Sequence, residues 1–213
     1  MPTPELANSA EPLTPRQQEI VDAAVRVVRE EGWSSLTVRR LAERLGVTDP
    51  ALYRHFRGKG ELALAIADRM QEMLLGPIRR IAANAAATPA ERIERILLHH
   101  VDLILATDGL PILLMAEAAT GDERLAGRLR QIMGEYMATV TAQIAALPGR
   151  AESDPAPEEV LFQLIGLPAV VALQLRLLPE RRLPEEQVRR MVARHVRQVL
   201  APERAEPTKE TSR

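Results

Sequence analysis

The sequence predicts an all-α protein of about nine helices, and three observations support this fold class. Apolar residues make up 46% of the 213-residue chain, but aromatic residues make up only 2%, so aliphatic side chains must fill the core. Apolar residues recur at helical spacing throughout, and no segment alternates as a strand does. Threonine-proline pairs such as Thr14-Pro15 and Thr88-Pro89 are typical of helix N-termini.

The first predicted helices rest on such boundary signals and on an apolar stripe. The first follows Thr14-Pro15 and stops at Gly32, the second is capped by Thr37, and the third carries Pro50 in its first turn. A bend is expected in the fourth helix, at residues 76–77. The predicted helices cover residues 15–32, 38–45, 50–56, 59–87, 89–106, 109–118, 122–147, 158–178 and 184–200.

The second and third helices, joined at Leu45-Gly46-Val47, have the sequence form of a helix-turn-helix. Gly46 suits the turn, and apolar residues of both helices, including Leu52 and Phe56, would hold them together. Tyr53, Arg54 and His55 are left on the outward face, where they suit contacts with phosphates and base edges. An αα-hairpin with a solvated charged face has the same spacing, so spacing alone leaves both interpretations open.

The charge distribution favours the nucleic-acid interpretation. The whole chain has a formal net charge of −1. From Arg16 to Lys59, however, nine Arg or Lys residues face six acidic ones, a net charge of +3, which leaves −4 for the remainder. A basic N-terminal unit on an acidic body is typical of a DNA-binding head joined to a second domain.

These motifs resemble the N-terminal domain of the tetracycline-repressor (TetR/AcrR) family. The resemblance covers about residues 15–70 and rests above all on Ala51-Leu52-Tyr53-Arg54-His55-Phe56, followed by Lys59. It implies a homodimer with a three-helix DNA-binding head and a body that binds a small effector. It also implies a DNA-binding domain at 14–74 and an effector-binding and dimerisation domain at 75–202. The proline-containing residues 1–13 are expected to form a disordered arm, and the charged residues 203–213 a frayed tail.

The resemblance assigns DNA contacts by position. A two-fold dimer presents two recognition helices about one DNA turn apart, so the expected partner is a double-stranded, palindromic operator. Asp49 departs from many family members by placing an acid at the start of the recognition helix. It could accept a hydrogen bond from a cytosine amino group, or serve only as the helix N-cap, and we favour the cap. The expected contacts are Thr37, Arg39, Thr48, Asp49, Pro50, Ala51, Tyr53, Arg54, His55 and Lys59.

The body is predicted to enclose a pocket for a hydrophobic, neutral or weakly charged effector, although the same Met and Leu stripes are typical of plain core. The predicted lining is Ile78, Ile104, Leu114, Met115, Tyr136, Met137, Val140, Phe162 and Ile165. Polar groups that could orient a ligand are His99, His100, Asp102, Glu117, Gln163 and Gln174. His99 and Asp102 could join a metal site, but the ligand set is incomplete and no metal is expected.

The segment 158–178 is apolar almost all round, so it must be buried on two sides. We expect one side to pack on the body and the other on a second copy of the chain. The last helix presents an apolar stripe that would complete the dimer interface. The predicted interface is Gly166, Ala169, Val170, Leu173, Val188, Met191, Val192 and His195.

Three function classes follow. The first is a transcriptional repressor released by a small effector, and the second is a DNA-bound interaction protein of the same fold, as in nucleoid occlusion. The third is an enzyme. We expect no catalytic activity, because the sequence contains no catalytic triad, phosphate loop or metal motif. No cofactor is expected. No apolar leader follows Met1 and no 18-residue uncharged run occurs, which predicts a cytoplasmic protein without a membrane partner.

Overall fold

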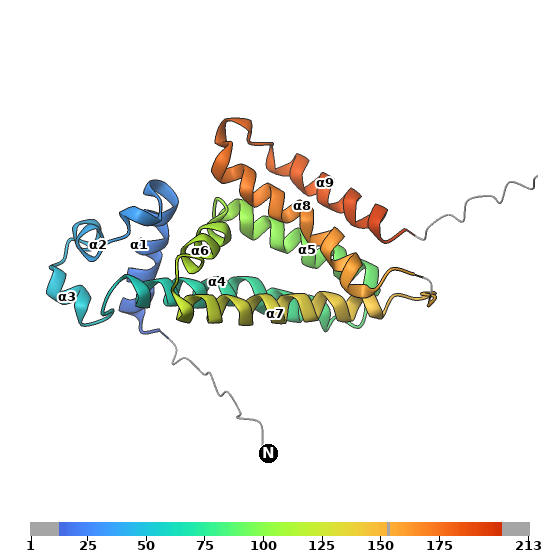
Figure 1. Ribbon diagram of the computed structural model, residues 1–213, viewed down its shortest axis with the longest axis horizontal. Helices are drawn as coiled ribbons and strands as arrows, with labels where there is room; N and C mark the ends of the chain where they lie inside the picture. The colour runs from blue at the N-terminus through green and yellow to red at the C-terminus, as the bar shows by residue number, and fades with distance from the viewer. Residues whose placement is uncertain (1–12, 153, 202–213) are drawn as a thin grey trace, which may run out of the picture. The chain divides into compact units, whose positions relative to one another are not determined.

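A computed structural model of the chain describes residues 13–152 and 154–201 (Figure 1). Most of the predicted arm and all of the predicted tail therefore lie outside the described residues. Helices are the only regular elements that these residues form: α1 Pro15–Glu31, α2 Val38–Leu45, α3 Asp49–Tyr53, α4 Lys59–Ala82, α5 Pro89–Ala106, α6 Leu110–Ala118, α7 Glu123–Ala145, α8 Pro157–Leu177, α9 Glu185–Val199, and the short 3₁₀ helices Trp33–Ser35 and Pro179–Arg181. The all-α prediction is confirmed.

The helix termini follow from local chemistry. At the start of α1 the Thr14 hydroxyl accepts a hydrogen bond from the Gln17 amide, and the Gln17 side chain accepts one from the Thr14 amide. Thr88 and Glu91 form the same capping box at the start of α5. Each box satisfies amides that a helix end leaves without intrahelical partners.

The chain separates into two compact units, Met1–Asp68 and Arg69–Arg213. The boundary falls inside α4, which remains helical through Gly76 and Pro77. This helix ends at Ala82, five residues before the predicted end at Ala87. Asn84 accounts for the difference, because its side chain accepts from the Ala86 amide and its carbonyl accepts from Arg92.

In the second unit, α5 is the central helix and packs against α7, α8 and α9 (Figure 1). Its inward residues Ile93, Ile96, Leu97 and Val101 are all fully buried. Burying an aliphatic side chain of this size contributes about 1.5–3 kcal/mol each. These contacts place α5 in the core of the unit.

The start of α6 lies very close to the backbone of α8. Gly109 precedes α6 with φ of +71°, and a Cβ atom built there would lie 2.8 Å from the Ala172 carbonyl oxygen. Both the backbone angle and the lack of space require glycine at this position.

Helix α8 has one buried face and one exposed apolar face. Val160, Leu161, Leu164 and Val171 are buried. Helix α8 is long and apolar enough to cross a membrane, but the core helix of a soluble protein can have the same length and hydropathy. We use the term α8 stripe for its exposed apolar residues, which recur at spacings of three, four or eight: Phe162, Val170, Leu173 and Leu177.

The apolar stripe of α9 is not available for an interface. Val188 and Val192 are 2% and 1% exposed, because this stripe packs on α5 and α8 within the unit. The Nε2 atom of His195 donates a hydrogen bond to the main-chain carbonyl oxygen of Gln163 on α8. The prediction that Val188 and Val192 form a dimer surface is therefore wrong. The outward side of α9 is charged and polar, with exposed Arg190, Arg194 and Arg197.

Candidate functional site

The first unit contains the predicted helix-turn-helix. Gly46 adopts the left-handed conformation, with φ of 64° and ψ of 34°, and ends α2. The amide of Val47 then donates to the Ala42 carbonyl and closes the turn. Leu41, Leu52 and Phe56 are buried between the helices. Glycine and these three anchors fix the angle at which α3 leaves α2.

The predicted DNA contacts are mostly solvent-exposed. Tyr53 is 53% exposed, although large aromatic side chains are usually buried. Ala51, His55 and Lys59 are partly buried, and the other predicted contacts are exposed: Thr37, Arg39, Thr48, Asp49, Pro50, Tyr53 and Arg54. All ten residues lie between Thr37, the N-cap of α2, and Lys59, the first residue of α4, in one unit.

Asp49 is the first residue of α3, and Thr48 holds the N-cap position. The preferred interpretation of Asp49 as the cap is therefore wrong. Its carboxylate still lies in the first helical turn, where the helix dipole favours negative charge. The Thr37 hydroxyl, by contrast, accepts from the Arg40 amide and caps α2.

A cluster of ion pairs joins α2 to α1 and separates the arginines of α2 into two groups. Arg40 donates to both carboxylate oxygens of Glu31 at 2.9 Å, and Arg44 donates to Glu31 at 2.8 Å and to Glu30. The hydrogen bond from Arg40 is the main reason that the pKa of Glu31 is lowered. Arg39 instead has a side chain that is 83% exposed and pairs only at the surface with Glu43. Arg40 and Arg44 thus hold the head together, while Arg39 remains accessible.

Lys59 begins α4, and its ammonium lies over the Trp33 ring, 5.3 Å from the ring centroid. Trp33 is 8% exposed and belongs to a short 3₁₀ helix that the sequence pattern does not predict. This is a cation–π contact within the first unit. It restrains the Lys59 side chain next to the predicted DNA-facing residues.

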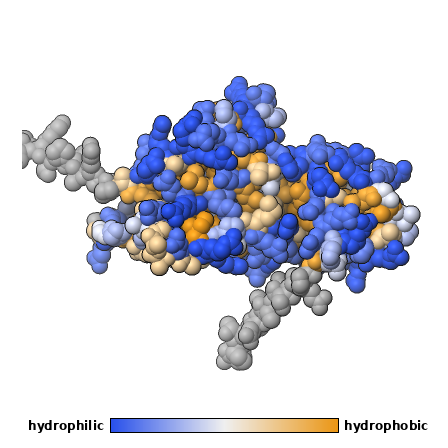
Figure 2. Space-filling model, turned by 180° about the vertical axis from the view of Figure 1, so that it is seen from behind, coloured by the Kyte–Doolittle hydropathy of each residue, from blue (hydrophilic) through white to orange (hydrophobic). Residues whose placement is uncertain are grey.

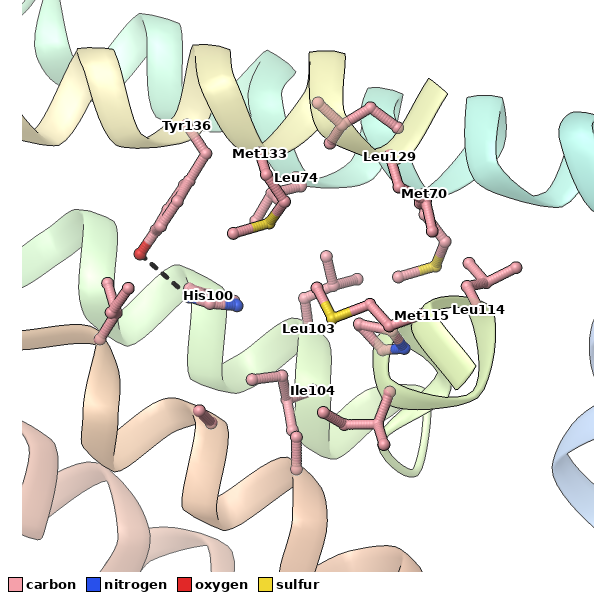
Figure 3. A pocket seen from close by; sticks show the side chains of 16 residues that line it. Met70, Leu74, His100, Leu103, Ile104, Leu114, Met115, Leu129, Met133 and Tyr136 are labelled. Atoms are coloured by element: carbon pink, nitrogen blue, oxygen red, sulfur yellow. Dashed lines mark hydrogen bonds between the residues drawn. The ribbon is translucent and has the colours of Figure 1, made fainter. Parts of the chain in front are cut away.

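The second unit contains a cavity of about 130 Å³ between α4, α5, α6, α7 and α8 (Figure 3). Three flexible methionines contribute to its wall. The lining consists of Met70, Leu74, His100, Leu103, Ile104, Pro111, Ile112, Leu114, Met115, Leu129, Ile132, Met133, Tyr136, Ile165, Ala169 and Ala172. The Asp, Glu, Lys and Arg residues of the described chain are not among them.

Five of the nine predicted pocket residues line this cavity: Ile104, Leu114, Met115, Tyr136 and Ile165. Ile78 and Val140 are fully buried but do not line it, and Met137 does not line it either. Phe162 is 63% exposed on the α8 stripe, so its placement in the pocket is wrong. The helical period gives the spacing of apolar residues, but for a helix that is apolar all round it cannot say which side faces the cavity.

His100 and Tyr136 form a hydrogen-bonded pair in the cavity wall. The Nδ1 atom of His100 lies 3.0 Å from the Tyr136 hydroxyl, and the rings meet edge to face at 4.9 Å (Figure 3). Burial lowers the pKa of His100 to about 4, with a smaller contribution from the neighbouring His99. Burial also raises the pKa of Tyr136. Both groups are therefore uncharged at neutral pH.

The other polar candidates lie outside the cavity wall. His99 bonds to the Met73 carbonyl at 2.9 Å, and Asp102 accepts from Arg189 at 2.7 Å. Gln174 donates to the Arg181 carbonyl, and Gln163 offers its carbonyl to His195. Within the described residues, His, Asp and Glu side chains form no cluster suited to a metal ion.

Most of the molecular face shown in Figure 2 is hydrophilic, and hydrophobic residues reach the surface in several separate places. The largest exposed apolar side chains belong mainly to α8 and the residue after it, from Phe162 to Leu178. Of the predicted interface, Gly166, Ala169, Val170 and Leu173 are exposed, and Met191 and His195 are partly buried. One helix thus supplies most of the candidate interface.

Comparisons with known protein sequences agree on one family. The family model described as bacterial regulatory proteins, tetR family, matches residues 20–66. The nucleoid occlusion factor SlmA of Vibrio vulnificus is 31% identical over 156 residues, which cover 71% of this chain and 79% of that protein. An uncharacterized HTH-type transcriptional regulator of Mycobacterium tuberculosis is 27% identical over 180 residues, which cover 82% of this chain and 89% of the other.

Solved structures share the fold. The transcriptional regulator FadR from Bacillus subtilis in complex with stearoyl-CoA superposes with a TM-score of 0.68 at 16% identity, covering 84% of this chain and 96% of the other. AibR in complex with isovaleryl coenzyme A and operator DNA gives a TM-score of 0.65 at 20% identity, again covering 84% and 96%. At these identities the likeness concerns the fold alone.

Proposed function

We propose, from the premise that this chain belongs to the tetR family of bacterial regulatory proteins, that it represses transcription as a dimer on a palindromic operator. Release would follow when a small apolar effector enters the cavity of the second unit. As a family member the chain is a DNA-binding transcriptional regulator; the dimer, the operator symmetry and the effector are the proposed parts. It would act in the cytoplasm, without catalysis.

The observation that carries this proposal is the pairing of an exposed helix-turn-helix face with an internal apolar cavity on one chain. The head exposes Thr37, Arg39, Tyr53 and Arg54 as a polar surface, while the apolar anchors beneath it are buried. Phosphate contacts from such residues position a recognition helix, and base contacts specify the sequence. The second unit holds empty apolar space where an effector would bind.

Helix α4 is the element through which ligand binding would act. It begins with Lys59 next to the head contacts and carries Met70 and Leu74 in the cavity wall. A ligand can shift an equilibrium only by its difference in affinity for the two states. We therefore propose that the effector prefers an α4 position in which the two heads of a dimer no longer match successive major grooves.

The α8 stripe is the proposed dimer surface, and from α9 only the half-buried Met191 and His195 are proposed to reach it. Val170 and Leu173 are 61% and 45% exposed, and a two-fold interface would bury them against the same residues of the second copy. Changing Val170→Glu would place a charge at this surface. Arg190→Glu on the exposed side of α9 is the matched control.

The test combines operator selection with sedimentation. Selection of binding sites from random duplex DNA should give a near-palindrome whose half-sites lie about one helical turn apart. The natural chain and the Arg190→Glu variant should sediment as dimers, whereas Val170→Glu should sediment as a monomer with strongly reduced operator affinity. A single asymmetric half-site, or a monomeric natural chain bound to DNA, would refute the dimeric part of the proposal.

A second candidate is a DNA-bound interaction protein. The 31% identity to the nucleoid occlusion factor SlmA and the exposed α8 stripe favour it. The two candidates differ in what the cavity does. Operator release by a small molecule that contacts His100 supports the repressor; unchanged operator affinity when the cavity is occupied supports the interaction protein.

A further inference from the structure

The cavity wall contains two polar side chains among sixteen lining residues, and both are uncharged. These are His100 and Tyr136, and they bond to each other through Nδ1 and the hydroxyl. Burial keeps the imidazole neutral, since its pKa is lowered to about 4. An ionised ligand group inside this wall would lose its hydration and gain no counter-charge.

His100 has one ring nitrogen left for a ligand. Its Nδ1 atom faces Tyr136, whereas Nε2 lies on the other side of the ring, toward the space between the labelled side chains of Figure 3. No residue in the described part of the chain hydrogen-bonds Nε2. If the tyrosine hydroxyl donates to Nδ1, Nε2 carries the proton and donates; in the other tautomer Nε2 accepts. A hydroxyl on the ligand matches both tautomers.

The size of the cavity limits the ligand. The volume is about 130 Å³, and an apolar cavity of about 150 Å³ takes up a molecule as large as benzene. Met70, Met115 and Met133 can adjust the shape, because methionine side chains are unbranched and flexible. The space fits one small ring or a short aliphatic chain.

We infer that the cavity binds a small, uncharged, mostly apolar molecule that carries a single hydroxyl or similar polar group, which hydrogen-bonds to His100 Nε2. The inference rests on the proposed function, because it names the chemical class of that effector. A coenzyme A moiety, with its charged phosphates, does not fit inside this wall.

Three probes of one shape test the inference on the natural chain: phenol, benzene and benzoate. Binding is followed without DNA, by the chemical shifts of the His100 ring at pH 7 and by calorimetry. We expect phenol to bind about 2- to 10-fold more tightly than benzene, the range given by one net hydrogen bond. Benzoate should bind at least about 100-fold more weakly than phenol, because its carboxylate would be buried without a partner.

The variant His100→Leu separates the hydrogen bond from the cavity itself. It should remove the advantage of phenol over benzene while leaving benzene binding within about threefold of its natural value. Glu159→Gln in the exposed first turn of α8, which changes a charge outside the cavity wall, should leave all three affinities unchanged. Circular dichroism shows whether each variant is folded. If His100→Leu does not fold, the affinities of the three probes for the natural chain still test the inference.

Each outcome has a defined meaning. Equal binding of phenol and benzene, benzoate binding as tight as phenol, or no binding of any probe overturns the inference. Because the titration contains no DNA, its result does not depend on repression. If phenol binds as expected but operator affinity is unchanged, the inference stands and release by an effector fails. If a molecule releases the operator without changing the His100 signals, the inference fails. Release of the operator by an effector then still stands.

Discussion

The ammonium nitrogen of Lys59 lies 5.3 Å from the centroid of the Trp33 ring, so the first residue of α4 is held by an aromatic face from the preceding 3₁₀ helix. Trp33 is also the single tryptophan of the sequence. Its fluorescence therefore reports on the immediate surroundings of Lys59. A DNA phosphate that binds the ammonium would change this signal, which makes the contact measurable in the natural chain.

Replacing Lys59→Ala should weaken binding to every DNA sequence alike and lower the slope of log affinity against log salt by about 1, as expected for one lost phosphate contact. Titrations at several salt concentrations measure this slope. Arg44→Ala serves as control, because Arg44 is engaged with Glu30 and Glu31 and should leave the slope unchanged. An unaltered slope for Lys59→Ala would remove Lys59 from the phosphate contacts.

Replacing Trp33→Leu should keep the charge of Lys59 but release its side chain. A cation–π contact contributes about 0.5–1 kcal/mol at such sites, so operator affinity should fall by about 2- to 5-fold with the salt slope retained. Trp33→Tyr, which keeps an aromatic face, should restore most of the affinity. Loss of affinity in both variants with intact circular dichroism would show that Trp33 acts through packing instead.

Replacing Glu31→Gln should destabilise the head, because two arginines then lose their shared carboxylate. Thermal unfolding of the first unit, followed by Trp33 fluorescence, measures the effect. Since the pKa of Glu31 is lowered in the folded protein, its contribution is present above the unfolded pKa and is lost as pH falls through the folded value. The variant should therefore show a weaker acid dependence, whereas Glu19→Gln, paired at the surface with Arg16, should resemble the natural chain.

The second unit should lose stability as pH falls from about 6.5 to about 4. His100 stays neutral in the folded state, with a pKa of about 4, while the unfolded chain takes up a proton near pH 6.5. This difference amounts to about 3 kcal/mol when fully developed. Urea denaturation across this range should show less pH dependence for His100→Gln than for His55→Gln. The four histidines can be followed individually by nuclear magnetic resonance, and a His100 titration near pH 6.5 would disprove the prediction.

Replacing Gly109→Ala should destabilise the second unit by about 1–3 kcal/mol through the positive φ alone, and further through the contact of 2.8 Å with Ala172. Gly134→Ala in α7 is the matched control, since a Cβ there meets nothing within 4 Å. That change should instead stabilise the protein by about 0.5–1 kcal/mol, because alanine favours a helix. Denaturant midpoints with unchanged slopes distinguish the two effects.

The helices were predictable because their ends carry local signals. Thr14, Thr88 and Gly46 act through neighbours a few residues away, so the sequence alone places these boundaries. The end of α4 was misplaced because Asn84 bonds to Arg92, a side chain that belongs to the next helix. The two 3₁₀ helices were missed because three residues are too short for a periodic pattern.

The faces of the apolar helices could not be predicted from the sequence. Val188 and Phe162 both belong to strongly apolar stripes, yet the first is buried within the unit and the second is exposed. Which side is covered depends on how α5, α8 and α9 pack, and this involves residues far apart in the chain. The Trp33–Lys59 contact has the same origin, since it joins positions 26 residues apart that share no local motif.

Helix α8 separates the cavity from the proposed dimer surface. An effector is expected on one side of the helix and a second copy of the chain on the other. Ile165, Ala169 and Ala172 border the cavity, while Val170 and Leu173 on the same helix face outward. Under the proposed function, filling one side and covering the other become linked equilibria, so each changes the free energy of the other by an equal amount. The effector concentration needed for a response would then vary with the number of protein copies in the cell, and abundance itself would set the sensitivity of the switch.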